Sequence, residues 1–450
     1  MTTPAATQPR RRGTCPGILA PMQVGDGLLL RVRVPAAVLP ADHARRIAEL
    51  GDRYGNGLID LSQRGNLQLR GIPADALEPV IESLRAMDYV SGDAASEAVR
   101  NVLCSPTAGL DPTALMDIRG VARTLDARLT EDAALHRLPP KFGWLVCGGG
   151  IGHLADSSTD VRFDAVDAER FRVSLGGTLA TAAPLGLCRA EDAADVASAL
   201  GRAFLDLRKS LPEPPRRMAG LVAAIGIEKV GARLSPSLSP LPPGERIKVR
   251  GTHLMDLFGS AEPLHPNRLP RGEKRSHVGI APAFLTTAFP FGRLTAAALA
   301  ALASACAEIR ITPWRTLLLV DPSTDAEKTA HNHGAILSHT DRRLKLTACS
   351  GAGGCDVGTT DTHATALAIA DRAGPLLDHV RMVHVSGCAK GCAHPAIADV
   401  TLTARDGLYD VALNAKPGDA VCQTRGHTGL SPADAVARVA DLLTEESTGA

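Results

Sequence analysis

Alternating apolar and polar side chains begin the ordered pattern of this chain. Between residues 28 and 35 every second position is apolar, which predicts a strand with one buried face. The apolar positions are Leu28, Leu30, Val32 and Val34, and Arg31 and Arg33 lie on the opposite face. The pattern then predicts a helix at about 41–52, strands at 58–61 and 66–70, and a helix at about 75–87. We expect this β-α-β-β-α order to fold as one small unit.

A weaker copy of the same pattern lies in residues 277–321. It predicts a strand, a helix rich in Ala and Leu, and then strand, turn and strand, with Pro313-Trp314-Arg315 in the turn. Both copies have the order of a ferredoxin-like half. Farther along, the pattern predicts a helix at 361–378, strands near 382–385 and 397–401, and a last amphipathic helix with Ser431 as its N-cap.

Composition limits the classes of protein to which the chain belongs. Its 450 residues suggest about two to four domains. A net charge of +1 argues against nucleic acid or a membrane surface as the main partner. The sequence has no apolar run of roughly 20 residues, and the basic stretch within residues 1–13, expected to be a disordered leader, is not followed by the apolar segment of a signal peptide. Ten cysteines without a secretion signal indicate a reducing cytoplasm.

Four of these cysteines form two closely spaced pairs in glycine-rich segments. Cys349 and Cys355 have five residues between them, and Cys388 and Cys392 have three. Thiolates at such spacing on glycine-rich loops are typical of an iron–sulfur cluster. A structural zinc ion is the main alternative, although it usually takes pairs two to four residues apart. A further alternative is that the four are ordinary buried cysteines that bind no metal.

The segments TACSGAGGC and HVSGCAKGCAHP, which hold these cysteines, resemble the cluster motif of the sulfite and nitrite reductases. In that family four such cysteines bind a 4Fe-4S cluster, and the last one also bridges to the iron of sirohaem. The resemblance extends over residues 14–415. It implies an α+β, sulfite/nitrite reductase-like fold with two duplicated ferredoxin-like halves, which pair, and two α/β domains, one after each half, with the 4Fe-4S site in the C-terminal one. The expected divisions are the first half at 14–90, the first α/β domain at 91–265, the second half at 266–328 and the 4Fe-4S-binding domain at 329–450.

Basic residues gather in the first half of the chain. Arg31, Arg33, Arg64 and Arg70 could form an anion-binding face, or simply a solvated strand face. The segment LSQRGNLQLRGI resembles the family segment that holds the carboxylates of the macrocycle, with Arg64 at the key position. Arg100 and Lys141 also match basic family motifs. These six residues are the expected substrate-binding set, and Arg310 and Arg315 would extend it. The resemblance assigns no catalytic residue.

One departure from the reductase pattern suggests a different substrate. The second lysine of the family's K-F-K motif would lie at Gly143. Its loss argues against reduction of a small anion and suits a larger ligand. HVSGCAKGCAHP and the Pro-Trp-Arg turn are most similar to the precorrin-3B synthases, a branch of the same family.

That resemblance implies a monooxygenase acting on precorrin-3A with O2, hydroxylating C20 and closing a γ-lactone. It also implies a 4Fe-4S cluster, a mononuclear non-haem iron, and a separate electron donor fed by NADH. The alternatives are a sirohaem-dependent sulfite or nitrite reductase, and a metal-bearing module that only binds a tetrapyrrole.

Other motifs carry less information. The run CGGGIG at 147–152 lacks the third glycine and the following helix of a dinucleotide site, so it predicts a tight hairpin turn. Histidines 331, 333, 339, 363, 384 and 394 lie near or within the cysteine region, without forming an evident iron-binding set. His394, two residues after Cys392, is the strongest candidate among them. Cys15, Cys104, Cys188, Cys306 and Cys422 are expected to be structural.

Overall fold

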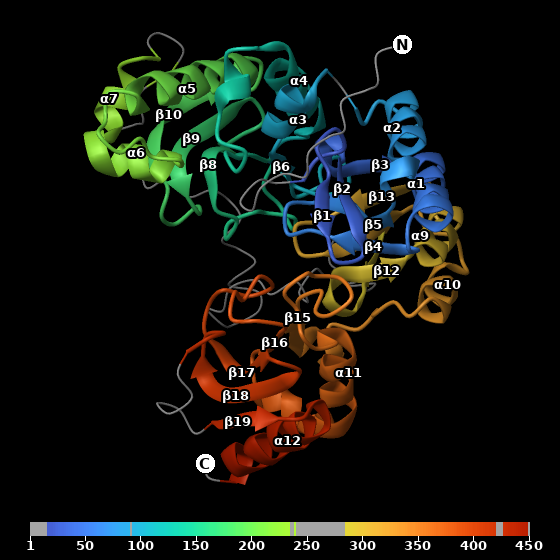
Figure 1. Cartoon of the computed structure of the whole chain (residues 1–450). Coiled ribbons are helices and arrows are strands. Elements are labelled where there is room, and N and C mark those ends of the chain that lie inside the picture. Colours follow the sequence, from blue (N-terminus) through green and yellow to red (C-terminus); the bar gives the residue numbers. More distant parts are fainter. Residues whose placement is uncertain (1–15, 91, 235–237, 240–283, 420–425, 449–450) are drawn as a thin grey trace, which may run out of the picture.

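The computed structural model describes residues 16–90, 92–234, 238–239, 284–419 and 426–448, which form four β-sheets (Figure 1). The expected leader, Cys15 and Cys422 lie outside these residues. In Figure 1 the fourth sheet, coloured orange to red, lies below the other three. None of the described helices has the length and apolar character needed to cross a membrane.

The first and third sheets correspond to the two predicted halves. The first has the order β1 (Met22–Val24), β2 (Gly27–Arg33), β5 (Asn66–Ile72), β4 (Leu58–Leu61) and β12 (Arg293–Thr295), with helices α1 (Ala41–Tyr54) and α2 (Leu77–Ala86). The third has the order β11 (Phe284–Ala288), β14 (Thr316–Val320), β13 (Glu308–Ile311) and β3 (Val38–Pro40), with helices α9 (Ala296–Ser304) and α10 (Ala326–Asn332). The strands and helices predicted from the apolar alternation are therefore confirmed.

Each half gives one short strand to the sheet of the other. Strand β3 belongs to the first half but pairs with β13, and β12 belongs to the second half but pairs with β4. Each of these strands follows a 3-10 turn, η1 (Pro35–Ala37) or η5 (Pro290–Gly292), in which a non-glycine residue has positive φ. Helices α1 and α9 pack together, and a single apolar core contains residues of both halves. The exchange therefore joins the two halves into one folded unit.

The second and fourth sheets share one strand plan. The second runs β6 (Val102–Cys104), β7 (Trp144–Cys147), β8 (Thr159–Ala165), β9 (Arg170–Gly177) and β10 (Ala183–Arg189). The fourth runs β15 (Leu346–Ala348), β16 (Val383–Ser386), β17 (Ala398–Arg405), β18 (Leu408–Ala415) and β19 (His427–Leu430). In both sheets the first three strands run parallel to one another, and each of the last two strands pairs antiparallel with the strand before it. The duplication therefore includes the sheets as well as the halves.

Helices flank these two sheets. The second sheet packs with α3 (Ala94–Val99), α4 (Arg119–Glu131), α5 (Ala193–Arg208), α6 (Met218–Ile225) and α7 (Ile227–Gly231). The fourth packs with α11 (Thr362–Ala373) and α12 (Pro432–Thr448). The Ser431 hydroxyl accepts a hydrogen bond from the Asp434 N–H at 3.2 Å, which confirms the predicted N-cap.

The predicted hairpin at residues 147–152 is wrong. Strands β7 and β8 on either side of this run are parallel, so residues 148–158 form a crossover connection instead. The glycines do mark a turn, since Gly149 and Gly150 have φ of 84° and 72°. Strand direction is decided by the sheet, however, because β7 lies buried between two parallel neighbours.

Candidate functional site

The four paired cysteines lie on two neighbouring loops of the fourth sheet. Cys349 directly follows strand β15, and Cys388 comes two residues after strand β16. Because these strands are parallel, their carboxyl ends meet at one edge of the sheet, where α/β folds hold their ligands. The Gly387 N–H donates a hydrogen bond to Cys349 Sγ at 3.1 Å, which joins the two loops. The fold therefore brings together the two pairs that are 33 residues apart in sequence (355 to 388).

Glycine is required where the two loops approach each other. A Cβ atom at Gly387 would lie 3.2 Å from Gly351 Cα and 3.4 Å from Cys349 Sγ. Gly391, between the cysteines of the second pair, has φ of 59°, a conformation that glycine adopts without strain. Backbone N–H groups can therefore turn toward the sulfurs, as iron–sulfur sites require.

The four paired thiols are neighbours, but their sulfurs are not gathered as tightly as a single zinc ion would hold them. Burial raises the pKa of Cys392, and the nearby Cys349, Cys388 and Cys355 raise it further, so the four thiols are neighbours. All four lie in the described part of the chain, yet no three of their sulfurs come within 4.8 Å of one another. Tetrahedral zinc would hold its sulfurs about 3.8 Å apart, given Zn–S bonds of about 2.3 Å. A cubane of several metals needs the wider arrangement.

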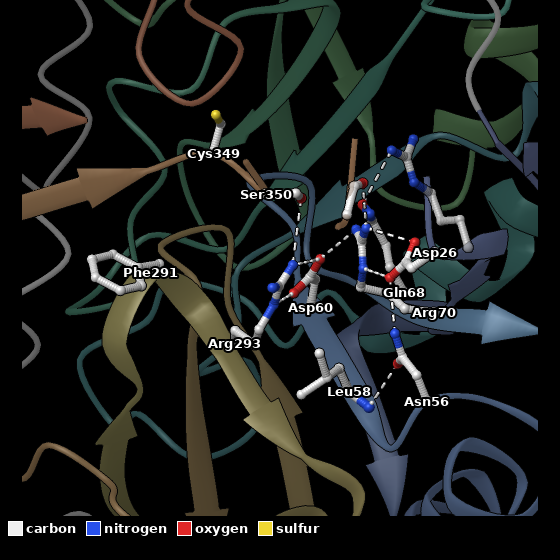
Figure 2. Close-up of polar contacts among 12 residues, drawn as sticks. Asp26, Asn56, Leu58, Asp60, Gln68, Arg70, Phe291, Arg293, Cys349 and Ser350 are labelled. Carbon is white, nitrogen blue, oxygen red and sulfur yellow. Dashed lines mark hydrogen bonds and ion pairs between the residues drawn. The ribbon is translucent and has the colours of Figure 1, made fainter. Parts of the chain in front are cut away.

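A network of charged side chains fixes the first cysteine loop to the ferredoxin-like halves (Figure 2). Arg70 forms ion pairs with Asp26 at 2.9 Å and with Asp60 at 3.0 Å, and donates to the Gly354 carbonyl at 2.7 Å. From the other half, Arg293 pairs with Asp60 at 2.6 Å. Arg293 also donates to the Ser350 hydroxyl at 3.4 Å.

This network keeps its central carboxylate charged. Burial alone would raise the pKa of Asp60, but the hydrogen bond and charge of Arg293 and the charge of Arg70 lower it below 3.8. The neighbouring His363 has a pKa lowered to about 4, by burial first and by Arg293 second. The side chain of Arg70 is 3% exposed and is held by these carboxylates, and its assignment to substrate binding stays a prediction.

A cleft with a volume of about 530 Å³ lies between the two halves, the second sheet and the cysteine domain. Its lining comes from all four parts of the fold. The polar and aromatic residues include Arg64, Asn101, Phe291, Trp314, Arg315 and His394. This volume falls within the range of small-molecule sites in proteins.

The guanidinium of Arg64 lies beside Gly143 at the cleft. A Cβ atom at Gly143 would lie 3.1 Å from Nη1 of Arg64, so a side chain there would crowd the guanidinium. Within the described residues, the Arg64 guanidinium has no hydrogen bond or ion pair. Arg64 therefore presents a free cation to the cleft.

Arg315 is a second cation on the cleft wall and is held in a strained backbone conformation. Its φ is 59°, which costs free energy in any residue with a Cβ. The hairpin turn containing Arg315 matches the turn of the first half, where the positive φ is taken by Gly65. Its Nη1 donates to the Phe291 carbonyl at 3.4 Å, and its buried Nε has no partner in the part of the chain that the structure describes. Burial lowers the pKa of Arg315, and the Asp60 charge opposes this.

The other predicted basic residues are arranged differently. Arg33 is buried and pairs with Glu97 at 3.0 Å. Arg100 is buried and pairs with Asp126 at 2.6 Å. These arginines therefore hold the fold together, and their assignment to substrate binding stays a prediction.

Arg31 and Lys141 complete the predicted set. Arg31 lies on strand β2 and donates to Gln68 at 3.4 Å, while Lys141 is exposed and does not line the cleft. Arg310 is 1% exposed and pairs with Glu308. Of the basic residues that the sequence singled out, Arg64 and Arg315 are those that line the cleft.

Two histidines lie beside the second cysteine loop. His384 on strand β16 is completely buried, and neither ring nitrogen has a hydrogen-bond partner within the described ranges. Its ring meets that of His394 edge to face, with centroids 5.8 Å apart. Burial, and then the charge of His394, lower the pKa of His384 to about 4. The remaining predicted histidines, at 331, 333 and 339, are exposed.

A group of three side chains was not expected from the sequence. Cys147, His153 and Asp164 bring one ligand atom each within 4.8 Å of one another, and all three are buried. Their spacing, Cys-x5-His followed by an aspartate ten residues on, was a possible signal. From the sequence, the glycine run between Cys147 and His153 predicts only a turn.

Comparisons with known proteins agree with this architecture. The nitrite/sulfite reductase ferredoxin-like half domain matches residues 20–87, and the nitrite and sulphite reductase 4Fe-4S domain matches residues 95–239. The four paired cysteines lie after both segments. The Mycobacterium tuberculosis NirA protein has a similar structure, with a TM-score of 0.65, 20% identity, and coverage of 92% of this chain and 79% of that one. The predicted sulfite/nitrite reductase-like fold is therefore confirmed.

Two curated relatives differ in activity. A precorrin-3B synthase from Sinorhizobium sp is 28% identical over 90% of this chain and 83% of its own length. A ferredoxin–nitrite reductase from Synechococcus elongatus is 26% identical over 93% of this chain and 86% of its own length.

Proposed function

Because this chain belongs to the nitrite and sulfite reductase superfamily, we propose that it is an oxidoreductase with the activity of a precorrin-3B synthase. The reaction inserts one atom of O2 as a hydroxyl group at C20 of precorrin-3A and closes a γ-lactone from the ring A acetate. The second oxygen atom leaves as water, formed with two electrons and two protons from an external donor.

The space at Gly143 is the observation that carries this proposal. A reductase acting on a small anion needs cations crowded around that anion. Here the second lysine position is vacant, and the Arg64 guanidinium lies where the lysine side chain would begin. Without a side chain at residue 143, the Arg64 guanidinium occupies this space and lines the cleft, so one cation faces the ligand where the reductase pattern has two lysines.

The chemistry of the cleft suits a polycarboxylated tetrapyrrole. Arginine binds carboxylates through two parallel hydrogen bonds and keeps its charge at neutral pH. Arg64 and Arg315 come from the two halves of the chain, so they could hold carboxylates on different parts of one macrocycle. Trp314 and Phe291 would contact its apolar face.

Cys349, Cys355, Cys388 and Cys392 are proposed to hold a 4Fe-4S cluster, which supplies one-electron transfer when bound. Cys392 is exposed at the surface, whereas the other three are half-buried. An exposed edge suits electron entry from a separate donor protein, as the name of the ferredoxin-dependent relative also suggests. NADH is expected to be the ultimate reductant.

The mononuclear iron implied by the family resemblance finds only a partial site beside the cysteine loops. His384 and His394 offer imidazoles near the cleft, and imidazole is a suitable ligand for iron. Among the described residues no third ligand gathers with them within 4.8 Å. No step of the reaction is therefore assigned to such an iron.

A sirohaem-dependent nitrite reductase is the second candidate, because the Synechococcus relative covers as much of the chain as the precorrin-3B synthase does. In that case the same cleft would hold sirohaem as a cofactor, and the basic side chains would bind its carboxylates.

Anaerobic purification followed by a visible spectrum and iron, sulfide and zinc analysis separates these candidates. The proposed function predicts a broad cluster shoulder, about four sulfides per chain, and no Soret band. Incubation with precorrin-3A, a reductant and labelled O2 should then give a product carrying one labelled oxygen atom. A strong Soret band together with nitrite reduction would replace the proposal by the reductase, and zinc without iron would reject both.

A further inference from the structure

The strand plan shared by the second and fourth sheets defines equivalent positions in the two repeats. The registers of β6 with β7 and of β15 with β16 align Cys104 with Ala348 and Val146 with Val385. The next residue of the first repeat, Ser105, then corresponds to Cys349. The ends of β6 and β7 are therefore the counterpart of the two cysteine loops.

A hydrogen bond at the same place in both repeats supports this equivalence. The Gly148 N–H donates to the Ser105 hydroxyl at 3.0 Å, as the Gly387 N–H donates to Cys349 Sγ at 3.1 Å. The first repeat thus keeps the loop geometry of the second, although Ser105 replaces the cysteine.

This counterpart contains its own set of metal-ligand side chains. Cys147 ends strand β7, His153 lies on the crossover connection, and Asp164 lies on β8. Their exposures are 0%, 6% and 0%, and their ligand atoms lie within 4.8 Å of one another. His153 Nε2 is buried and has no hydrogen-bond partner among the described residues, which costs free energy unless a ligand satisfies it.

We propose that Cys147, His153 and Asp164 bind one divalent transition-metal ion, separate from the cluster of the second repeat. Thiolate, imidazole and carboxylate together favour Zn²⁺ or Fe²⁺, whereas Mg²⁺ and Ca²⁺ prefer oxygen ligands alone. Three protein ligands leave a fourth position for water.

The surroundings of the group suit a metal centre. Arg162 is fully buried and donates to both carboxylate oxygens of Asp164, at 2.8 and 3.0 Å. Hydrogen-bonded partners of this kind orient ligating carboxylates in metal sites and leave lone pairs for the ion. The thiolate and the carboxylate supply two negative charges and Arg162 one positive charge, so the site offers a net negative charge to a cation.

The ion would stabilise one wall of the cleft. Its ligands join β7, the connection 148–158 and β8, and residues 156–158 of that connection line the cleft. Leu103 and Trp314 pack against the apolar cluster around Cys147 and also line the cleft. The site therefore positions the wall without touching the ligand.

Metal analysis of the full-length, cluster-loaded protein tests this proposal. Protein supplied with Zn²⁺ should hold about one zinc ion per chain in addition to the cluster iron. Cys147→Ser and His153→Gln should each lose most of that zinc and keep the cluster absorbance. Cys188→Ser, which alters a buried cysteine elsewhere in the same sheet, should keep both. Equal zinc in all four proteins would overturn the proposal.

A measurement on the wild-type protein covers the case in which the variants do not fold. After the single ion is removed with a mild chelator, added Co²⁺ should produce a thiolate-to-cobalt charge-transfer band and restore a melting temperature lowered by the chelator. The absence of both effects would overturn the site. Incorporation of labelled oxygen into precorrin-3A tests the proposed function and does not depend on this ion, so the two proposals fail separately.

Discussion

At the scale of single residues, the cleft is distinguished by cations that lack a carboxylate partner among the described residues. Arg33, Arg70 and Arg100 are neutralised by ion pairs within the fold, whereas Arg64 and Arg315 are not. The backbone of Arg315 is also strained, because its φ is positive. An unpaired cation in a strained conformation contributes little to stability, so it points to a role in ligand binding.

Replacing Arg315 with glycine should separate binding from folding. Glycine adopts positive φ without strain, so the melting temperature of Arg315→Gly should be equal to or above that of the wild type. Affinity for a polycarboxylated tetrapyrrole such as uroporphyrin should fall about 10- to 100-fold, because one charge-assisted carboxylate contact is lost. Fluorescence titration and thermal unfolding measure the two effects.

The matched control for that variant is Arg342→Gln, which removes an exposed arginine that pairs with Asp378 outside the cleft. It should leave tetrapyrrole affinity unchanged. A lower melting temperature with unchanged affinity in Arg315→Gly would mean that Arg315 is structural.

Introducing lysine at position 143 should close the opening beside Arg64. The new Cβ would lie 3.1 Å from the guanidinium, and the added cation would repel it. We expect Gly143→Lys to weaken tetrapyrrole binding at least about tenfold, while Gly143→Ala, which adds only the Cβ, should have a smaller effect. Titration calorimetry at two salt concentrations would check this, and equal affinity in all three proteins would reject the space at Gly143 as the deciding feature.

At the scale of elements, Asp60 joins strands of different origin. It lies on β4 and pairs with Arg70 on β5 and with Arg293 on β12, the strand that the second half contributes. Both arginines also hold the loop between Cys349 and Cys355 through Gly354 and Ser350 (Figure 2). One carboxylate thus links the strand exchange to the proposed cluster loop.

Removing that charge should destabilise the fold and reduce its sensitivity to acid. Asp60→Asn leaves the buried Arg70 and the half-buried Arg293 each short of a partner and should lower the free energy of unfolding by about 3 kcal/mol. The folded pKa of Asp60 is below 3.8, so its contribution is complete above about pH 4 and is lost as the pH falls through the folded value. Denaturant unfolding between pH 3 and pH 7 should therefore show a smaller loss on acidification in Asp60→Asn. An identical pH dependence in both proteins would contradict this role.

At the scale of the whole molecule, the chain is a repeat of a half followed by a sheet, and the cleft lies where the repeats meet. The halves supply Arg64 and Arg315, the first repeat's sheet supplies residues 156–159, and the cysteine domain supplies His394. Because no single part contains the cleft, ligand binding depends on how all the parts are assembled.

Loss of the cluster should therefore affect ligand binding as well as visible absorbance. Cys355→Ser should abolish the visible absorbance, and it should also weaken tetrapyrrole binding, because the loop that holds Cys355 is attached to Arg70 through Gly354. Cys188→Ser, in a buried cysteine far from the paired ones, should retain both properties. A full cluster in Cys355→Ser, judged by absorbance and sulfide content, would contradict the ligand assignment.

Local pattern determined much of this fold in advance. Strands β2, β4 and β5 were predictable because their apolar side chains alternate, and α1 because its apolar residues recur on one face. The pairs of cysteines were recognisable because metal centres require particular ligands at short spacing. These properties depend on residues that are close in sequence.

Contacts between distant residues decided the rest. Three-residue strands such as β3 and β12 are too short to produce an alternation, so their exchange between the halves followed only from pairing. The direction of β8 depended on the strands beside it, which overturned the predicted hairpin. The positions of Glu97, Asp60 and Asp126 in space decided which of the predicted arginines form ion pairs within the described fold. The sequence by itself determined the elements and the ligand types, and the tertiary structure determined which charges are neutralised and which face the cleft, because electrostatic pairing acts through space and not along the chain.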